Sequence, residues 1–238
     1  MDLVELPPSF AATREALRAI ACQVIAPARK AVDGHIGLAA TGDGFGSPPF
    51  GERPRRIVVR GTALVVEDGG SVVSRAPITT VAAAAALVGI DVVDDPAIGS
   101  ERTQVAPDVA LAVDLDASTA LGAWYALGDM ALVELRDELA ASGTASGITL
   151  WPEHFDLACD WGPDAEHRVN LGASPGDAGI AEPYLYVGPW DKDAFTADGY
   201  WNAPFGATLT YGAIAADPDP LATASAFYAE GIARLALR

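Results

Sequence analysis

The sequence is poor in cysteine and histidine, and it contains no long hydrophobic run. Its two cysteines, Cys22 and Cys159, are too few and too far apart for a disulfide framework or a cysteine-rich zinc site. We expect both to be small buried side chains. The alanine-rich stretch 81–88 ends at Gly89, well short of the roughly 20 apolar residues of a membrane span. The sequence therefore predicts no membrane association.

Basic residues are also scarce, with 15 Lys and Arg against 32 Asp and Glu and a formal net charge of -17. This charge opposes binding to nucleic-acid phosphates and to anionic lipid surfaces, so neither is an expected partner. The first eight residues lack the basic flank and the apolar segment of a signal peptide. We expect a soluble cytoplasmic protein, and an oligomer remains open.

Half of the 238 residues are hydrophobic, which is ample for a buried core. Apolar periodicity and capping residues predict four helices, at 9–31, 77–88, 117–141 and from about 217 onward. β-Branched and aromatic runs predict strands at 36–40, 57–59, 64–66, 72–73, 148–151, 154–160, 167–171, 183–188 and 206–211. The Gly/Pro-rich stretch 42–54 is predicted to be a flexible loop, and Asp68-Gly69-Gly70 a tight turn.

These elements predict an α+β fold with mainly antiparallel sheets flanked by about four helices. The halves 1–95 and 110–238 each follow the order helix, strands, helix, and are expected to pack as one globular protein. The segments 35–40 and 154–159 share a His-apolar-x-Leu-Ala pattern, and Pro-Phe-Gly recurs at 49–51 and 204–206. Ancient duplication and chance matching of common residues are both compatible with this similarity.

Two features of the sequence resemble functional sites, but their residues do not support a catalytic or an anion-binding role. Residues 172–176 match the G-x-S-x-G pattern of serine hydrolases, but Pro175 has no N–H for an oxyanion hole. All three histidines precede Ser174, so the usual order of that triad cannot be met. A turn is the better interpretation. The basic cluster Arg53, Arg55, Arg56 and Arg60 is expected to pair with carboxylates rather than to hold an anion.

The segment 151–201 stands apart because it holds four of the five tryptophans and two of the three histidines. If residues 152–158 are extended, His154 and Asp156 share one strand face, as Tyr184 and Tyr186 do on theirs. Aromatic faces beside carboxylates are suited to polar ring ligands such as carbohydrates. We therefore predict binding of a small polar ligand. The candidate residues are Trp151, His154, Asp156, Tyr184, Tyr186 and Trp190.

Two alternatives stay open. A metal-dependent hydrolase would use His154, Asp156 and His167, since a His and an Asp two residues apart on a strand can share a metal. The sequence has no H-E-x-x-H or comparable zinc signature, so no metal and no other cofactor is expected. In the other alternative the protein is structural or forms subunit contacts, and its aromatic segment is core or interface.

Several long blocks of the second half resemble a known family. They are Leu150–Ala158, Asn170–Asp177, Glu182–Trp190 and Trp201–Gly206. Together these blocks are similar to an uncharacterised family of actinobacterial cytoplasmic proteins. The resemblance covers residues 148 to 237 well and the first half only loosely. It implies a soluble bacterial protein, and it transfers no catalytic residue.

Overall fold

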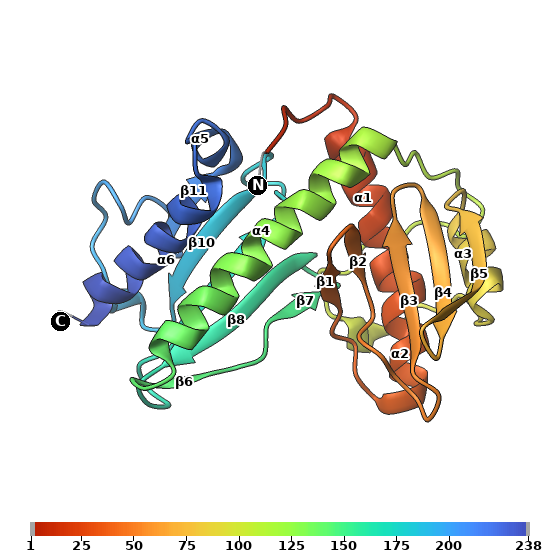
Figure 1. Ribbon diagram of the computed structural model, residues 1–238, viewed down its shortest axis with the longest axis horizontal. Helices are drawn as coiled ribbons and strands as arrows, with labels where there is room; N and C mark the ends of the chain where they lie inside the picture. The colour runs from red at the N-terminus through yellow and green to blue at the C-terminus, as the bar shows by residue number, and fades with distance from the viewer. Residues whose placement is uncertain (1–2, 237–238) are drawn as a thin grey trace. The chain divides into compact units, whose positions relative to one another are not determined.

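The computed structural model describes residues 3–236 and confirms the α+β class, with one five-stranded and one six-stranded antiparallel sheet (Figure 1). The chain divides into two compact units. The N-terminal unit comprises residues 5–126 and 150–155, and the C-terminal unit comprises 127–149 and 156–236 together with residues 3–4. Within residues 3–236, no helix combines the length and apolar character that crossing a membrane requires.

The N-terminal unit begins with one continuous helical segment, as the sequence predicts for 9–31. It consists of α1 (Phe10–Ile20), a π-helical turn η1 (Ala21–Ile25) and α2 (Ala26–Asp33). The π turn was not predicted. It buries Gln23, whose side-chain amide exchanges two hydrogen bonds with the backbone of Val105. Gly34 ends α2 in the left-handed conformation, φ 80°, which glycine adopts without strain.

The sheet of this unit is an antiparallel meander in the order β1-β2-β3-β4-β5. Its strands are Ala39–Thr41, Gly44–Gly46, Arg55–Arg60, Ala63–Asp68 and Ser71–Pro77. The central residues of β3 and β4 are buried on both faces. Gly69 and Gly70, φ 58° and 82°, form the predicted turn between β4 and β5.

Strand β2 corrects the prediction of a flexible loop over 42–54. Phe45 is buried in this strand, and its neighbours are glycines because the backbone of β3 approaches so closely. A Cβ on Gly44 would lie 2.2 Å from the Val59 carbonyl oxygen, and one on Gly46 would lie 2.4 Å from that of Ile57. The glycine content therefore reflects strand pairing rather than flexibility.

Two shorter helical elements follow the sheet: α3 (Val81–Val88) and a 3₁₀ turn η2 (Pro96–Ile98). Helix α3 starts later than the predicted Pro77, which instead closes β5. The Thr80 side chain accepts a hydrogen bond from the Ala83 N–H and so caps the helix.

The expectation that the arginine cluster pairs with carboxylates is confirmed for three of its members. Glu67 bridges Arg56 and Arg60, and Arg55 lies 3.9 Å from Asp68. Glu67 and Asp68 lie on β4, which faces the arginines on β3, and Arg60 also pairs with Asp43 at 3.2 Å.

The longest helix, α4 (Leu115–Leu139), contributes its first part to the N-terminal unit and residues from Leu127 onward to the C-terminal unit. It starts two residues before the predicted position, and Asp114 accepts a hydrogen bond from the Ala117 N–H at its start. The units therefore do not coincide with the predicted halves 1–95 and 110–238. Residues 150–155 also return to the N-terminal unit, where Leu150 bridges to Leu38.

The sheet of the C-terminal unit has the order β11-β10-β9-β8-β6, with β7 also paired to β8. Its strands β6 to β11 are Thr144–Ala145, Thr149–Trp151, Asp156–Gly162, Val169–Ser174, Tyr184–Pro189 and Ala207–Thr210, and of β7 only Thr149 belongs to the C-terminal unit. A 3₁₀ turn η3 (Lys192–Ala194) precedes β11, and the helices α5 (Tyr211–Ala215) and α6 (Pro220–Ala236) follow it.

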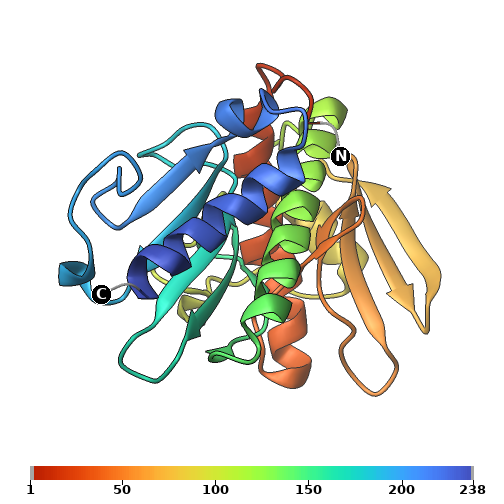
Figure 2. The same ribbon diagram turned by 60° about the vertical axis from the view of Figure 1, so that its left-hand side comes forward.

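Alternation along β8 to β11 gives this sheet two chemically different faces. Figures 1 and 2 both show α6 lying beside the C-terminal part of α4. A Cβ on Gly128 of α4 would meet Ala173, and one on Gly231 of α6 would meet Val187, so Ala173 and Val187 belong to the face that these helices cover. We call the opposite face the polar face. It carries Asp156, Ala158, Asp160, Arg168, Asn170, Gly172, Ser174, Tyr184, Tyr186, Gly188, Trp190, Thr208 and Thr210.

Candidate functional site

The six candidate ligand-binding residues are divided between the two units. Trp151 and His154 belong to the N-terminal unit. The C-terminal unit holds the other four, and all of them lie on the polar face. They are Asp156, Tyr184, Tyr186 and Trp190.

The prediction that His154 and Asp156 share one strand face is wrong, because residues 152–155 form a turn and β8 starts only at Asp156. Phe155 has a left-handed backbone, φ 58°, and its N–H donates to the Trp151 carbonyl at 2.7 Å. The Phe155 ring is buried edge-on against Phe45 and Tyr125, whose hydroxyl donates to the Phe155 carbonyl. These contacts hold a backbone conformation that costs a residue other than glycine about 1 to 3 kcal/mol.

The turn leaves His154 and Trp151 at the surface. The His154 side chain is half exposed, and its Nδ1 lies 3.3 Å from Glu101. A histidine that binds no ligand is often buried and hydrogen-bonded in the core, and His154 is not of that kind. Trp151 is 39% exposed.

On the polar face, the Tyr186 hydroxyl donates a hydrogen bond to Asp156 Oδ2 two strands away. The ring crosses Gly172 on the strand between them, and a Cβ there would lie 2.4 Å from Tyr186 Cζ. Burial of the hydroxyl, together with the Asp156 charge, raises the pKa of Tyr186 well above its usual value. Tyr186 is therefore a neutral donor that holds Asp156 in one position.

Tyr184 lies on the same face as predicted, with its ring centroid 6.3 Å from that of Tyr186. Its hydroxyl donates to Asp177 Oδ2 at 2.6 Å, while Asp177 Oδ1 accepts two backbone N–H groups of its own loop. Burial and this bond raise the pKa of Tyr184. Tyr184 is only 6% exposed, so it orders the 175–183 loop and offers little surface to a ligand.

Ser174 ends β9 and is 5% exposed, and its Oγ accepts from the Gly176 N–H at 3.2 Å. Strand β9 continues into a loop that leads to β10, and this part of the described chain contains no helix. A nucleophile elbow requires a helix after the serine, so residues 172–176 do not form one. The predicted turn is not formed either, because residues 172–174 belong to β9 and residues 175–176 begin the loop.

Trp190 is the most exposed aromatic ring on the polar face, with 51% of its surface accessible. Its indole Nε1 donates to Asn170 Oδ1 at 2.8 Å, and the Arg168 guanidinium lies 5.8 Å from the ring centroid. Arg168 is itself anchored by Asp160 on the neighbouring strand. The indole is therefore exposed and yet fixed in orientation.

Phe205, 37% exposed, adds a second ring at this face, edge-on to Tyr186 at 6.5 Å. The Lys192 ammonium holds the adjoining loop by donating to the carbonyls of Pro189 and Phe205. Sequence reasoning missed Phe205 and Arg168. Only the second Pro-Phe-Gly motif drew attention to Phe205, whereas the period-two alternation with Asn170 could have placed Arg168.

No three His, Cys, Asp or Glu side chains within residues 3–236 are arranged to hold a metal ion. His167 of the hydrolase hypothesis is exposed and hydrogen-bonds Asp164 at 2.9 Å. That bond raises the pKa of His167 and lowers the pKa of Asp164 to about 2.

Comparison of the chain with protein-family models, with curated proteins and with solved structures finds no match. The resemblance of residues 148 to 237 to an actinobacterial family therefore stays a prediction.

Proposed function

We propose that the protein binds a small polar ring ligand, of the class of neutral saccharides, on the polar face of the C-terminal unit. One observation carries the proposal: Trp190 is half exposed and is nevertheless held by Asn170 and by Arg168. An exposed indole costs free energy by leaving apolar surface in water, and its fixed orientation removes the entropy loss that a ligand would otherwise impose on it.

The groups around Trp190 suit a saccharide. The flat indole offers a surface for sugar C–H groups, and Phe205 offers a second one nearby on the same face. The Asn170 Oδ1 is used by Trp190, while its amide nitrogen has no hydrogen-bond partner in the described chain and is free to donate to a hydroxyl. The carboxylates of Asp156 and Asp160 on the same face disfavour acidic sugars.

Fluorescence titration of the purified protein with a panel of neutral mono- and disaccharides tests this function. We expect at least one saccharide to give a saturable change in tryptophan emission, and Trp190→Ala to weaken its binding by about tenfold or more, as loss of a stacking ring does. Trp151→Ala is the matched control, because Trp151 is another exposed indole but belongs to the N-terminal unit. Equal loss in both variants, or no saturable change with any sugar, contradicts the proposal.

The edge strand β5 favours a second function as a subunit-interaction protein. Within residues 3–236 it pairs only with β4, and Val72 and Val73, which lie at the irregularity in its register with β4, are 55% and 57% exposed. Antiparallel pairing of β5 with its copy in a second chain would satisfy this edge. Sedimentation should then show a dimer that Val73→Lys disrupts. A wild-type monomer at all concentrations rules this function out.

The metal-dependent hydrolase with His154, Asp156 and His167 remains a hypothesis without a supporting observation. Membership of the actinobacterial family, and with it a cytoplasmic location, is likewise part of the proposal and rests on the sequence blocks of the second half.

A further inference from the structure

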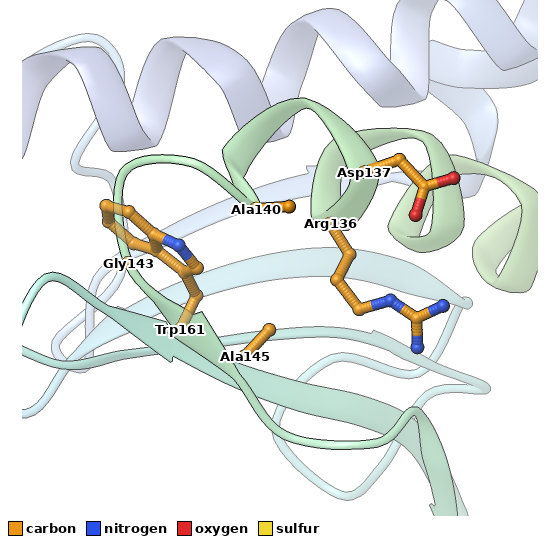
Figure 3. A pocket seen from close by; sticks show the side chains of 6 residues that line it. All are labelled: Arg136, Asp137, Ala140, Gly143, Ala145 and Trp161. Carbon is orange, nitrogen blue, oxygen red and sulfur yellow. The ribbon is translucent and has the colours of Figure 1, made fainter.

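A pocket of about 260 Å³ opens at the C-terminal end of α4, on the face of the sheet opposite the polar face (Figure 3). Its walls come from the end of the helix, the turn that follows and β8. The lining residues are Arg136, Asp137, Ala140, Gly143, Ala145 and Trp161. All six belong to the C-terminal unit.

The local backbone makes room for the indole of Trp161. Ala145 of β6 is the strand partner of Trp161, and the chain turns at Gly143 just before it. A Cβ on Gly143 would lie 2.5 Å from the Gly162 carbonyl oxygen and 2.9 Å from Trp161 Cε2, so a larger residue would displace both the β8 backbone and the ring. The pocket is therefore bounded at one end by an aromatic ring whose position the glycine defines.

Two hydrogen-bond donors of this pocket lack acceptors. Trp161 Nε1 is buried from solvent and has no hydrogen-bond partner in the described chain. The Arg136 guanidinium makes no hydrogen bond and no ion pair within 4 Å in residues 3–236, and its charge acts at longer range on Asp129 of the same helix. Figure 3 shows the indole at one end of the pocket and the guanidinium at the other. For the buried Trp161 N–H, the missing acceptor costs about 1 to 3 kcal/mol, which a bound acceptor would recover. The Arg136 guanidinium is half-buried and hydrated, so it contributes charge and direction instead.

The other groups that line the pocket restrict the class of ligand that it can bind. The methyls of Ala140 and Ala145 and the methylenes of Arg136 provide apolar wall between the two donors. Asp137 supplies a negative charge, which disfavours dianions such as phosphate or a dicarboxylate. A ligand with one negative charge, a short apolar spacer and a neutral acceptor would complement both the Arg136 guanidinium and the Trp161 N–H.

We propose that this pocket binds a small organic monocarboxylate that also carries a neutral carbonyl or hydroxyl oxygen. The carboxylate pairs with the planar fork of Arg136, and the neutral oxygen accepts the indole N–H of Trp161. This site is independent of the polar face, so its test can fail while saccharide binding at Trp190 succeeds, and the reverse.

The probe is 4-oxopentanoate, which has a carboxylate and a ketone separated by two methylenes. Its effect is read from the assigned indole N–H resonance of Trp161 in ¹H–¹⁵N spectra, so no Trp161 variant is needed. We expect a saturable shift of this resonance. Pentanoate, which lacks the ketone, should bind more weakly and move the resonance less, and methyl 4-oxopentanoate, which lacks the charge, should not bind.

Arg136→Gln should raise the dissociation constant of 4-oxopentanoate about tenfold or more, because a charged hydrogen bond is lost. Arg136→Lys keeps the positive charge but lacks the planar guanidinium, so its dissociation constant should lie between those of the wild type and Arg136→Gln. Arg53→Gln, at an exposed loop arginine of the N-terminal unit, is the matched control and should bind as the wild type does. The proposal is overturned by a Trp161 resonance that does not saturate, by equal binding of ester and acid, by stronger binding of inorganic phosphate, or by unchanged binding in Arg136→Gln.

Discussion

The contact between Tyr186 and Gly172 allows a sharp test of how the polar face is built. Replacing Gly172 by Ala places a methyl group 2.4 Å from Tyr186 Cζ and 2.5 Å from its hydroxyl oxygen. These distances are far below van der Waals contact, so the ring must move. Moving it breaks the hydrogen bond to Asp156, which depends on the ring lying across β9.

The steric clash and the lost hydrogen bond each lower the free energy of unfolding. Crowding a packed site with an extra methyl group costs about 1 to 3 kcal/mol, and loss of a hydrogen bond to a charged group costs about 1.5 to 3 kcal/mol. Since the displaced ring relieves part of the clash, we expect the free energy of unfolding to fall by about 2 to 5 kcal/mol. At this chain length the melting temperature should fall by about 5 to 15 °C.

Differential scanning calorimetry of Gly172→Ala and Gly188→Ala measures this difference. Gly188 lies on β10 and on the same face, but the nearest atom to its Cβ position is 3.6 Å away, so its replacement should change stability by less than about 1 kcal/mol. Gly172→Ala combined with Tyr186→Ala should be less destabilised than the sum of the single variants. Equal melting temperatures for Gly172→Ala and Gly188→Ala would refute the described position of the Tyr186 ring.

Three further predictions concern titratable groups. Burial raises the pKa of both Cys22 and Cys159 to about 11, so a disulfide reagent at pH 8 should label neither thiol in minutes, and both once the protein is denatured; rapid native labelling would contradict their burial. The hydrogen bond that His167 Nδ1 makes to the Asp164 carboxylate raises the pKa of His167 and lowers that of Asp164, so the pair stabilises the fold between the ordinary pKa values of 3.8 and 6.5. The effect is lost as pH rises through the raised His167 pKa or falls through the lowered Asp164 pKa. In NMR titration, Asp164→Asn should return the His167 pKa toward 6.5, and an unchanged value would be inconsistent with the pair. Burial raises the pKa of Tyr186, so stability should decline once the unfolded chain ionises near pH 10, and Tyr186→Phe should lessen that decline in alkaline melting curves.

Local patterns in the sequence predict the strands and the shared face of Tyr184 and Tyr186, because side chains alternate with a period of two along a strand. These patterns do not predict which strands pair, or which residues lie opposite one another in neighbouring strands. The register that aligns Ala158, Gly172 and Tyr186 depends on pairing between strands that the loops 163–168 and 175–183 separate. The hydrogen bond from Tyr186 to Asp156 therefore emerges only from the folded sheet.

The turn at 152–155 shows how tertiary contacts override local preference. Residues 154–157 alternate in polarity as a strand would, yet the buried rings around Phe155 and the hydroxyl of Tyr125 stabilise a left-handed backbone. Strand β2 is the opposite case, since its glycines favour a loop by composition and are required by the close approach of β3. In both places the deciding partner is distant in the sequence.

The central claim, ligand binding at the polar face, is tested most directly by the indole N–H resonances of the five tryptophans, recorded while neutral saccharides are added. The resonance of Trp190 should shift in a saturable manner, because its N–H donates to Asn170 within the proposed site. The resonances of Trp124 and Trp201, both buried, should stay in place. A Trp190 resonance that is unmoved by every saccharide, or a shift that appears equally at Trp151, would contradict the account.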